Sequence, residues 1–530
     1  MTADSVSLPV SSSVDRQLAH VTLVRPTLVA SGGAWVSSLT PPLGLAYLAA
    51  VLRENGNPVA IIDAIAEKPD QIIEESGYLF HGLTIDETVA QIDPDTDIIG
   101  ISCMFTQDWP WVRQLIRAVR DRLPDKLIVA GGEHATALPE FNLRDRPELD
   151  YCILGEGEET ILEIAAVFRD PEKLAKVAGT AYLEDGRYVQ NLPRQRIRAV
   201  DELPYPAWDL LPIETYLDTR NGFGVYRGRS MGILATRGCP YRCTFCSNPL
   251  MYGFVYVMRK PDDLLDEMQF YIDRYQVENF DFFDLTMAVK KKWVLEFCAR
   301  IEERGMRFTW QLPGGTRSEV IDDEVAAALH RTGCRNVTYA PESGSVETLK
   351  LIKKQVKLPR LQASIRSALR QGIVVKTHVI FGFPHERRRH LLQTLLFCWK
   401  LAVIGGHDLA CFMFSPYPGT ELFDELREKK VIGELDADYF RSLVGNRNLL
   451  SSIDYCEHVG ALELGLWRGF AQTSFYALSF LIRPWNFLRL IKNMITNEGV
   501  TSLEQRVNAL FRRRSTPAGA PRMAEQLNEG

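Results

Sequence analysis

The sequence has no hydrophobic run long enough to cross a bilayer. Its most apolar segment, residues 469–482, has 14 residues between Arg468 and Arg483, whereas a membrane-spanning helix needs about 20. This length excludes a spanning helix there and indicates a buried helix, so we expect no membrane association. The alternative is a helix that lies on a membrane surface, because Trp485 and several basic residues follow it.

The sequence also lacks an excess of positive charge and a cysteine framework. Its formal net charge of −6 gives no reason to expect a nucleic-acid partner. Residues 1–16 have no apolar core of the kind found in signal peptides, and ten cysteines without framework spacing point to the reducing cytoplasm. A length of 530 residues predicts two or more domains, and we expect residues 1–18 and 512–530 to be disordered.

Three cysteines do stand close together, at C-x3-C-x2-C spacing: Cys239, Cys243 and Cys246. They follow a strand-like run at 231–236, and thiolates this close on a loop can converge on one metal centre. An iron–sulfur cubane takes four cysteine ligands, so three leave one iron open to another ligand. A structural zinc site is the alternative, but no second C-x2-C lies downstream to complete it. The other seven cysteines stand singly and are predicted to be mostly buried thiols: Cys103, Cys152, Cys298, Cys334, Cys398, Cys411 and Cys456.

Short apolar strands alternate with helices from residue 19 to residue 190. We predict an α/β fold for this region, a Rossmann-like parallel sheet. The predicted strands are 21–24, 59–63, 97–102, 126–130 and 151–154. Ligands bind such sheets at the carboxyl ends of the strands. The loops at those ends are 102–107, 131–136 and 155–158, and ordinary turn chemistry is the alternative explanation of their glycines.

The chain becomes proline-rich after a predicted hairpin at 179–190. We interpret 191–228 as a connector over the surface of a second domain, which we place at 229–430. Six strand–helix units predict a partial (β/α)6 barrel there, with strands at 231–236, 279–284, 307–312, 335–340, 373–381 and 408–413. Active sites of parallel barrels lie at the carboxyl ends of the strands. From 431 to 511 the pattern is helical, and we expect a helical C-terminal cap over the barrel mouth.

The cysteine spacing, with Phe245 just before the third cysteine, resembles that of the radical S-adenosylmethionine (SAM) superfamily. The resemblance implies that the three cysteines hold a [4Fe-4S] cluster. It also implies that SAM chelates the fourth iron.

The upstream loops resemble the cobalamin (B12)-binding domain of B12-dependent radical SAM enzymes, over about residues 20–190. The cobalamin contacts that this resemblance implies are Ser102, Gly131, Gly132, His134, Gly155 and Glu156. Many B12 domains carry a D-x-H-x-x-G motif whose histidine coordinates cobalt, but none of the nine histidines here has Asp two residues before it. We therefore expect no protein histidine on cobalt, and expect His134 to hydrogen-bond cofactor side chains or nothing.

Residues at the barrel strand ends resemble the SAM contacts of the same family. The resemblance implies that Asp284 receives the ammonium of SAM and that Glu342, with Ser343 beside it, accepts from its ribose hydroxyls. Arg317, after the third strand, is a candidate for the carboxylate of SAM. A surface arginine is the alternative for Arg317, and a helix N-cap at Ser343 or Ser345 is the alternative for that motif. His385 stands where the family usually has a glycine.

The reaction that the resemblance implies is C-methylation. A 5′-deoxyadenosyl radical from SAM takes hydrogen from an unactivated carbon, and methylcobalamin supplies the methyl group; the cofactors carry this chemistry. A cyclase or oxidoreductase acting on a tetrapyrrole-like substrate without methyl transfer fits the same cofactors, and a B12-binding sensor is a third class. The expected partners are a small-molecule, lipid or tetrapyrrole substrate and a reductant such as flavodoxin or ferredoxin.

Overall fold

The computed structural model describes residues 18–31, 39–75, 78–220, 222–317, 320–445, 455–496, 498–505 and 507–508. The two segments that we expect to be disordered lie outside these residues, apart from Leu18. The chain divides into two compact units, which are described separately. The first comprises Met1–Gly32, Pro42–Ile213 and Leu250–Tyr252, and the second comprises Gly33–Pro41, Glu214–Pro249 and Gly253–Gly530.

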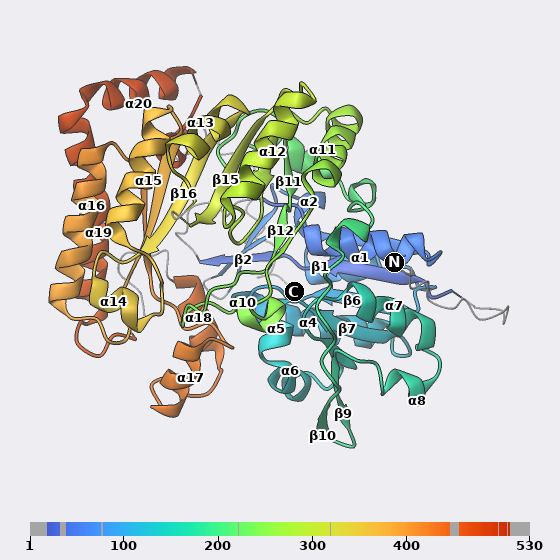
Figure 1. Cartoon of the computed structure of the whole chain (residues 1–530). Helices are drawn as coiled ribbons and strands as arrows, with labels where there is room; N and C mark the ends of the chain where they lie inside the picture. The colour runs from blue at the N-terminus through green and yellow to red at the C-terminus, as the bar shows by residue number, and fades with distance from the viewer. Residues whose placement is uncertain are drawn as a thin grey trace, which may run out of the picture. The chain divides into compact units, whose positions relative to one another are not determined.

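A seven-stranded sheet of order β10-β9-β8-β7-β6-β1-β3 forms the centre of the first unit (Figure 1). Five of its strands are parallel: β1 (Val21–Arg25), β3 (Val59–Asp63), β6 (Ile98–Ser102), β7 (Leu127–Gly131) and β8 (Tyr151–Ile153). In chain order these five are arranged 2-1-3-4-5, so the winding of the sheet reverses between β1 and β6. Such a switch point is where open α/β sheets bind ligands. The predicted Rossmann-like sheet is confirmed.

The predicted hairpin is also present, as β9 (Thr180–Glu184) and β10 (Arg187–Gln190), and it extends the sheet antiparallel to β8. A separate three-stranded antiparallel sheet, not predicted, consists of β2 (Leu28–Ser31), β5 (Tyr78–His81) and β4 (Ile72–Glu75). Its strands have four residues each, too few to show a clear alternation in the sequence.

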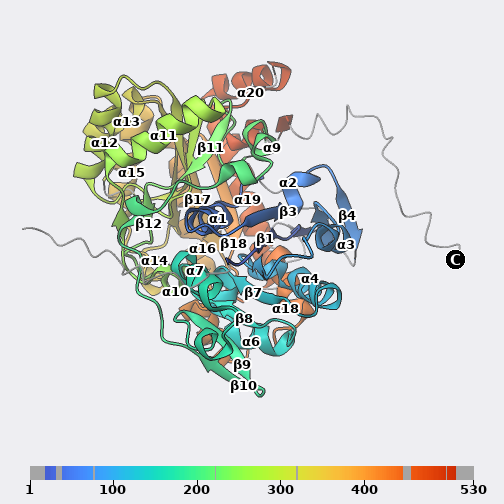
Figure 2. The same ribbon diagram turned by 90° about the vertical axis from the view of Figure 1, so that its right-hand side faces the viewer.

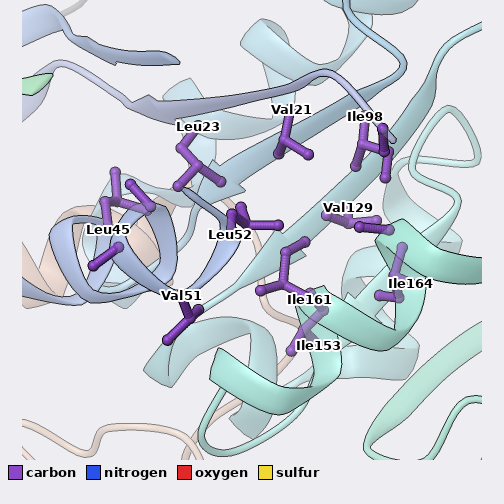
Figure 3. Close-up of a cluster of buried hydrophobic side chains, with 14 of the residues drawn as sticks. Val21, Leu23, Leu45, Val51, Leu52, Ile98, Val129, Ile153, Ile161 and Ile164 are labelled. Atoms are coloured by element: carbon purple, nitrogen blue, oxygen red, sulfur yellow. The ribbon is translucent and has the colours of Figure 1, made fainter. Parts of the chain in front are cut away.

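Helices α1 and α7 pack apolar side chains against the parallel sheet of the first unit. Figure 3 shows Val21, Leu23 and Ile98 from the sheet facing Leu52 and Ile161 from these two helices. Burying each such side chain contributes about 1.5–3 kcal/mol to the stability of the fold. This packing holds the strands in place, and with them the loops at their carboxyl ends. The helices of the unit are α1 (Leu43–Glu54), α2 (Ala64–Glu67), α3 (Ile85–Ala90), α4 (Trp109–Arg122), α5 (Glu133–Ala137), α6 (Pro139–Asp145), α7 (Glu158–Val167) and α8 (Pro171–Leu174).

The second unit contains a six-stranded sheet, all parallel and in sequence order. Its strands are β11 (Ser230–Ile233), β14 (Asn279–Phe282), β15 (Thr309–Thr316), β16 (Cys334–Glu342), β17 (Val374–Phe381) and β18 (Asp408–Met413). The connecting helices are α11 (Pro261–Tyr275), α12 (Lys291–Glu303), α13 (Asp323–Arg331), α14 (Val346–Leu351), α15 (Leu358–Arg370) and α16 (Arg388–Ile404). The predicted partial (β/α)6 barrel is confirmed (Figures 1 and 2).

The last residues of the predicted connector are built into this barrel. The backbone NH of Gly224 donates to Asp281, and that of Val225 donates to Gln311 at 3.0 Å. Val225 is buried. We expected this stretch to lie on the surface of the second domain, and that expectation is wrong for these residues. It follows two 3-10 turns, at Val200–Glu202 and Trp208–Leu210, and the short helix α9 (Ile213–Leu217).

The C-terminal region is helical, as predicted, but its longest helix does not cover the barrel mouth. Helix α19 (Ala461–Ile482) runs along the free edge of β18, where Gln472 accepts a hydrogen bond from the Cys411 NH at 3.0 Å. Tyr476 donates to Asp408 at 2.7 Å. These side chains satisfy an edge strand that would otherwise be open to other chains. The neighbouring helices are α17 (Glu421–Glu428), α18 (Ala437–Gly445) and α20 (Pro484–Thr496).

The prediction that 469–482 is a buried helix is correct for one side only. Ala471, Phe475 and Ser479 are buried, whereas Phe470 and Leu481 are exposed. Within the described residues, no helix combines the length and the hydropathy of a membrane span.

Candidate active site

The cysteine loop leaves the barrel at the carboxyl end of β11. A two-residue strand, β12 (Thr236–Arg237), precedes it, and Gly238 enters it with a φ of 83°. The Cys246 NH donates to the Cys243 carbonyl at 3.2 Å and closes the turn that brings these two residues together. Helix α10 (Asn248–Tyr252) begins directly after the loop.

The three cysteines of the loop differ from most of the others in exposure. Cys239, Cys243 and Cys246 are partly exposed and none forms a disulfide. Of the seven single cysteines, six are buried as predicted, and Cys411 is the exception. Burial raises the pKa of thiols such as those of Cys103 and Cys152, which keeps them protonated and unsuited to bind metal.

Hydrogen bonds hold the cysteine loop from two sides. The Thr244 NH donates to the Ile352 carbonyl at 3.1 Å, and the Thr244 carbonyl accepts from the Leu422 NH at 3.0 Å. On the strand side, Asp284 accepts from the Ala235 NH at 3.0 Å and from the Thr236 hydroxyl. Burial raises the pKa of Asp284 to about 6, although these hydrogen bonds oppose the shift. Asp284 therefore lies next to the loop and anchors its start.

Two cations lie beside the cysteine loop. Burial raises the pKa of the Cys243 thiol, and the positive charges of Lys354 and Arg317 act against that rise. Lys354 is a functional candidate that sequence reasoning missed, because the Lys353-Lys354 pair has the pattern of an exposed helix end. Its Nζ donates to Glu342 Oε1 at 2.9 Å. Burial lowers the pKa of Lys354, but Glu342 and Cys243 outweigh burial, and the pKa is raised.

Arg317 is buried, so the alternative of a surface arginine is wrong. Its guanidinium carbon lies 3.4 Å from the ring centroid of Tyr241, which stands between the first two cysteines. Its Nη2 donates to the Gln355 carbonyl at 3.0 Å. The cation is therefore held in place against the loop.

Glu342 is the last residue of β16 and Ser343 follows it, but their side chains have different partners. Glu342 has a φ of 68°, a left-handed backbone that costs a non-glycine residue about 1 kcal/mol or more. The Ser343 hydroxyl is fully buried and pairs with Thr394 of α16 at 3.0 Å. Ser345 is the N-cap of α14, accepting from the Thr348 NH. Only Glu342 of this motif is thus brought to the cysteine loop, through Lys354.

The segment around His385 packs on the same loop. The Phe383 ring lies 5.5 Å from that of Phe245 and 6.2 Å from that of His385. Glu386 turns inward and accepts from the Gly382 NH at 2.8 Å. Burial raises the pKa of Glu386 to about 7 despite that bond. An aromatic contact therefore links this strand end to the third cysteine.

The donor set of the loop fits an iron–sulfur cluster. Among the described residues, no three His, Cys, Asp or Glu side chains are arranged around a single metal ion. A cubane takes one thiolate on each of several irons, and the three partly exposed cysteines of the loop, beside two cations, can supply such thiolates.

In the first unit, three of the implied cobalamin contacts, Ser102, Gly131 and Gly155, lie at the carboxyl ends of three neighbouring strands. Ser102 pairs with Gly131 across β6 and β7, and Gly131 pairs with Ile153 of β8, two residues before Gly155. Gly132 has a φ of 121°, and a Cβ there would lie 2.7 Å from the Cys103 carbonyl oxygen. The backbone can make this close approach only with glycine.

Two apolar side chains that sequence reasoning did not single out stand exposed at the switch point. Met104 and Phe105 lie two and three residues after the end of β6, and about half of each side chain is exposed. Exposed apolar residues at the carboxyl ends of such a sheet suit a large, flat, partly apolar ligand.

His134 and Glu156 are held by the protein itself. His134 is buried, its Nδ1 lies 3.2 Å from the Thr106 hydroxyl, and burial lowers its pKa to about 3. Glu156 forms an ion pair with Arg196 and accepts from the Ile197 NH at 2.9 Å. Both side chains are therefore held in place by other residues of the first unit.

Comparison with known proteins identifies both parts of the chain. The family model of the B12 binding domain matches residues 32–165, and that of the radical SAM superfamily matches residues 233–398. An uncharacterised methyltransferase of Pyrococcus horikoshii is 30% identical over 407 residues, covering 76% of this chain and 82% of the relative. The chain belongs to the cobalamin-dependent radical SAM enzymes. The expected cofactors of this family, a [4Fe-4S] cluster, SAM and cobalamin, are confirmed with it.

Other members of the family differ in reaction. The anaerobic magnesium-protoporphyrin IX monomethyl ester cyclase of Rubrivivax gelatinosus is 26% identical and covers 75% of this chain and 68% of its own. Among solved structures, the methyltransferase TsrM from Kitasatospora setae, with cobalamin and [4Fe-4S] cluster bound, has a TM-score of 0.61 at 18% identity and covers 79% of this chain and 76% of its own. The enzyme OxsB, with aqua-cobalamin and SAM bound, has a TM-score of 0.66 at 16% identity, covering 94% and 75%. These two likenesses concern the fold.

Proposed function

We propose that this protein is a cobalamin-dependent radical SAM C-methyltransferase that methylates an unactivated carbon. The observation that carries the proposal is the loop with three partly exposed cysteines beside Lys354 and Arg317, in a chain whose 30% identical relative is named an uncharacterised methyltransferase. When bound, the cluster and SAM supply radical hydrogen abstraction, and cobalamin supplies the methyl group. The protein binds, orients and shields these groups.

The chain's own residues divide this work between them. Cys239, Cys243 and Cys246 are the cluster ligands. Arg317 is a fixed cation for the carboxylate of SAM, and Glu342 is an acceptor for its ribose hydroxyls.

Asp284 already accepts two hydrogen bonds at the start of the loop. A carboxylate has about four acceptor positions, so it can also receive the ammonium of SAM. The positive charges beside Cys243 stabilise the thiolate form that a metal requires.

The first unit supplies the cobalamin site at the switch point of its sheet. Ser102, Gly131, Gly132 and Gly155 line the carboxyl ends of neighbouring strands, with Met104 and Phe105 beside them. His134 is turned into the protein, so cobalt is bound without a histidine from this chain. We expect the enzyme in the cytoplasm, with a flavodoxin- or ferredoxin-type reductant.

A cyclase or oxidoreductase is the second candidate, because the magnesium-protoporphyrin cyclase matches three quarters of the chain. The mass of the product separates the two reactions. An increase by one CH2 supports methylation, whereas loss of hydrogen or gain of oxygen supports the alternative.

The experiment is an anaerobic assay of the reconstituted protein with candidate apolar substrates, followed by mass spectrometry of substrate and SAM products. We expect 5′-deoxyadenosine and a methylated product from the wild type. The Cys243→Ala variant should form neither. A wild type that never cleaves SAM would leave only a B12-binding sensor and would contradict the proposal.

A further inference from the structure

Helix α20 (Pro484–Thr496) has its polar side turned toward the protein. Asn486 and Asn493 are buried. Asn493 donates to Glu504 Oε2 at 3.0 Å, and Arg489 donates to Glu504 Oε1 at 2.9 Å. Glu504 is itself buried. A surface helix of a globular protein places its polar side in water, so α20 has the reverse orientation.

The opposite side of α20 is apolar and exposed. Leu488 and Ile495 are 65% and 81% exposed, and Trp485 is 61% exposed. Their spacing of three to seven residues, with Ile491 between them, places them along one side of the helix. We call Trp485, Leu488, Ile491 and Ile495 the α20 outer face. Leu481, near the end of α19, is also exposed.

The helix that carries this face has an exposed cation, and the sequence around it lacks carboxylates. Residues 464–497 contain neither Asp nor Glu. Arg489 pairs with Glu504 on the inner side and Arg468 is buried, so neither adds charge to this face. Lys492 is exposed on α20 itself, four residues after Leu488. Trp485 and Lys492 combine an apolar body with a polar or charged end, the residue types that helices use at a lipid–water boundary.

We propose that the α20 outer face binds the surface of a bilayer that contains anionic lipids. The helix lies in the interface, because 13 residues are too few to cross. Figures 1 and 2 both show α20 at the periphery of the second unit. Single exposed apolar residues such as Leu192 and Val346 are ordinary at protein surfaces. A clustered apolar face beside an exposed cation, Lys492, marks an interaction site. This inference does not depend on which reaction the enzyme catalyses.

The test is co-sedimentation of the full-length reconstituted protein with vesicles of phosphatidylcholine, with and without phosphatidylglycerol. We expect binding that is tighter with phosphatidylglycerol. The triple variant Leu488→Ser, Ile491→Ser and Ile495→Ser should bind more weakly by a factor of about ten or more. The matched control, Leu192→Ser with Val346→Ser, replaces equally exposed but isolated residues and should bind like the wild type.

A charge variant keeps the test independent of how the triple variant folds. Lys492→Glu retains every apolar side chain, and it should weaken binding to the phosphatidylglycerol vesicles more than to pure phosphatidylcholine. Absence of binding by the wild type, or unchanged binding by the triple variant, would overturn the proposal. A third result would also overturn it: the wild type self-associates, the triple variant does not, and neither protein binds vesicles. The α20 outer face would then bind a second copy of the chain.

Discussion

Lys354 brings a positive charge to the cysteine loop. Its charge acts on Cys243 together with that of Arg317, and its Nζ is fixed by Glu342 at 2.9 Å. Its neighbour Lys353 is exposed and pairs with Glu421 instead. Of these two adjacent lysines, one thus lies beside the cysteine loop and the other is exposed. This difference depends on the fold and is not visible in the sequence.

Replacing Lys354 should change the cluster rather than merely the stability of the protein. The Lys354→Met variant removes a positive charge near the thiolates, so the oxidised cluster is favoured and its midpoint potential falls, by on the order of 50 mV. Redox titration followed by EPR measures this shift. Lys354→Arg should restore the potential, and Lys353→Met is the matched control. A Lys354→Met potential equal to that of the wild type would show that the charge does not reach the cluster.

His134 makes the first unit sensitive to acid. Burial lowers its pKa to about 3, so below pH 6.5 the unfolded chain binds a proton that the folded unit does not. The free energy of unfolding then falls as the pH falls below 6.5, by at most about 1.4 kcal/mol per pH unit.

Urea unfolding between pH 7 and pH 5 measures this slope. The His134→Gln variant should lose that part of it, while the control His20→Gln should not. Identical slopes for His134→Gln and the wild type would contradict the burial of a neutral imidazole.

At the scale of elements, the strand ends were the most predictable part of the site. Short apolar runs located all five parallel strands of the first sheet and all six of the second. Parallel strands bring their carboxyl ends to one edge, and so the cysteine loop, Glu342 and the glycine loops could be assigned to ligand-binding edges. Side-chain direction could not be predicted in the same way. Ser343 turns to Thr394 and Glu156 to Arg196 because of partners 51 and 40 residues away along the chain.

Gly132 tests the tight loop between β7 and α5. The Gly132→Ala variant places a methyl group 2.7 Å from the Cys103 carbonyl oxygen in a left-handed backbone, so the unit should lose about 1–3 kcal/mol of stability and retain less cobalamin. Gly186→Ala is the control, since Gly186 also has a positive φ but no atom lies within 4 Å of its Cβ position. The measurements are urea unfolding and the cobalamin content after gel filtration. Equal cobalamin retention by both variants would contradict the role of this loop.

At the scale of the whole molecule, the sequence motifs identified the cofactors but not the reaction. Relatives named as methyltransferases and as cyclases both match about three quarters of this chain, so the motifs do not separate the two reactions. The domain boundaries 19–190, 229–430 and 431–511 remain predictions. The sequence suggested a membrane-surface helix only as an alternative, because Trp485, Leu488 and Ile495 also have the spacing of an ordinary buried face.

The most direct test of C-methyltransferase function needs no knowledge of the substrate. The protein is reconstituted with iron, sulfide and cobalamin without oxygen, reduced, and given SAM with a deuterated methyl group. We predict deuterated methylcobalamin on the protein and an equal amount of S-adenosylhomocysteine. Cleavage of SAM to 5′-deoxyadenosine with cobalamin left unmethylated would contradict the account and favour a cyclase.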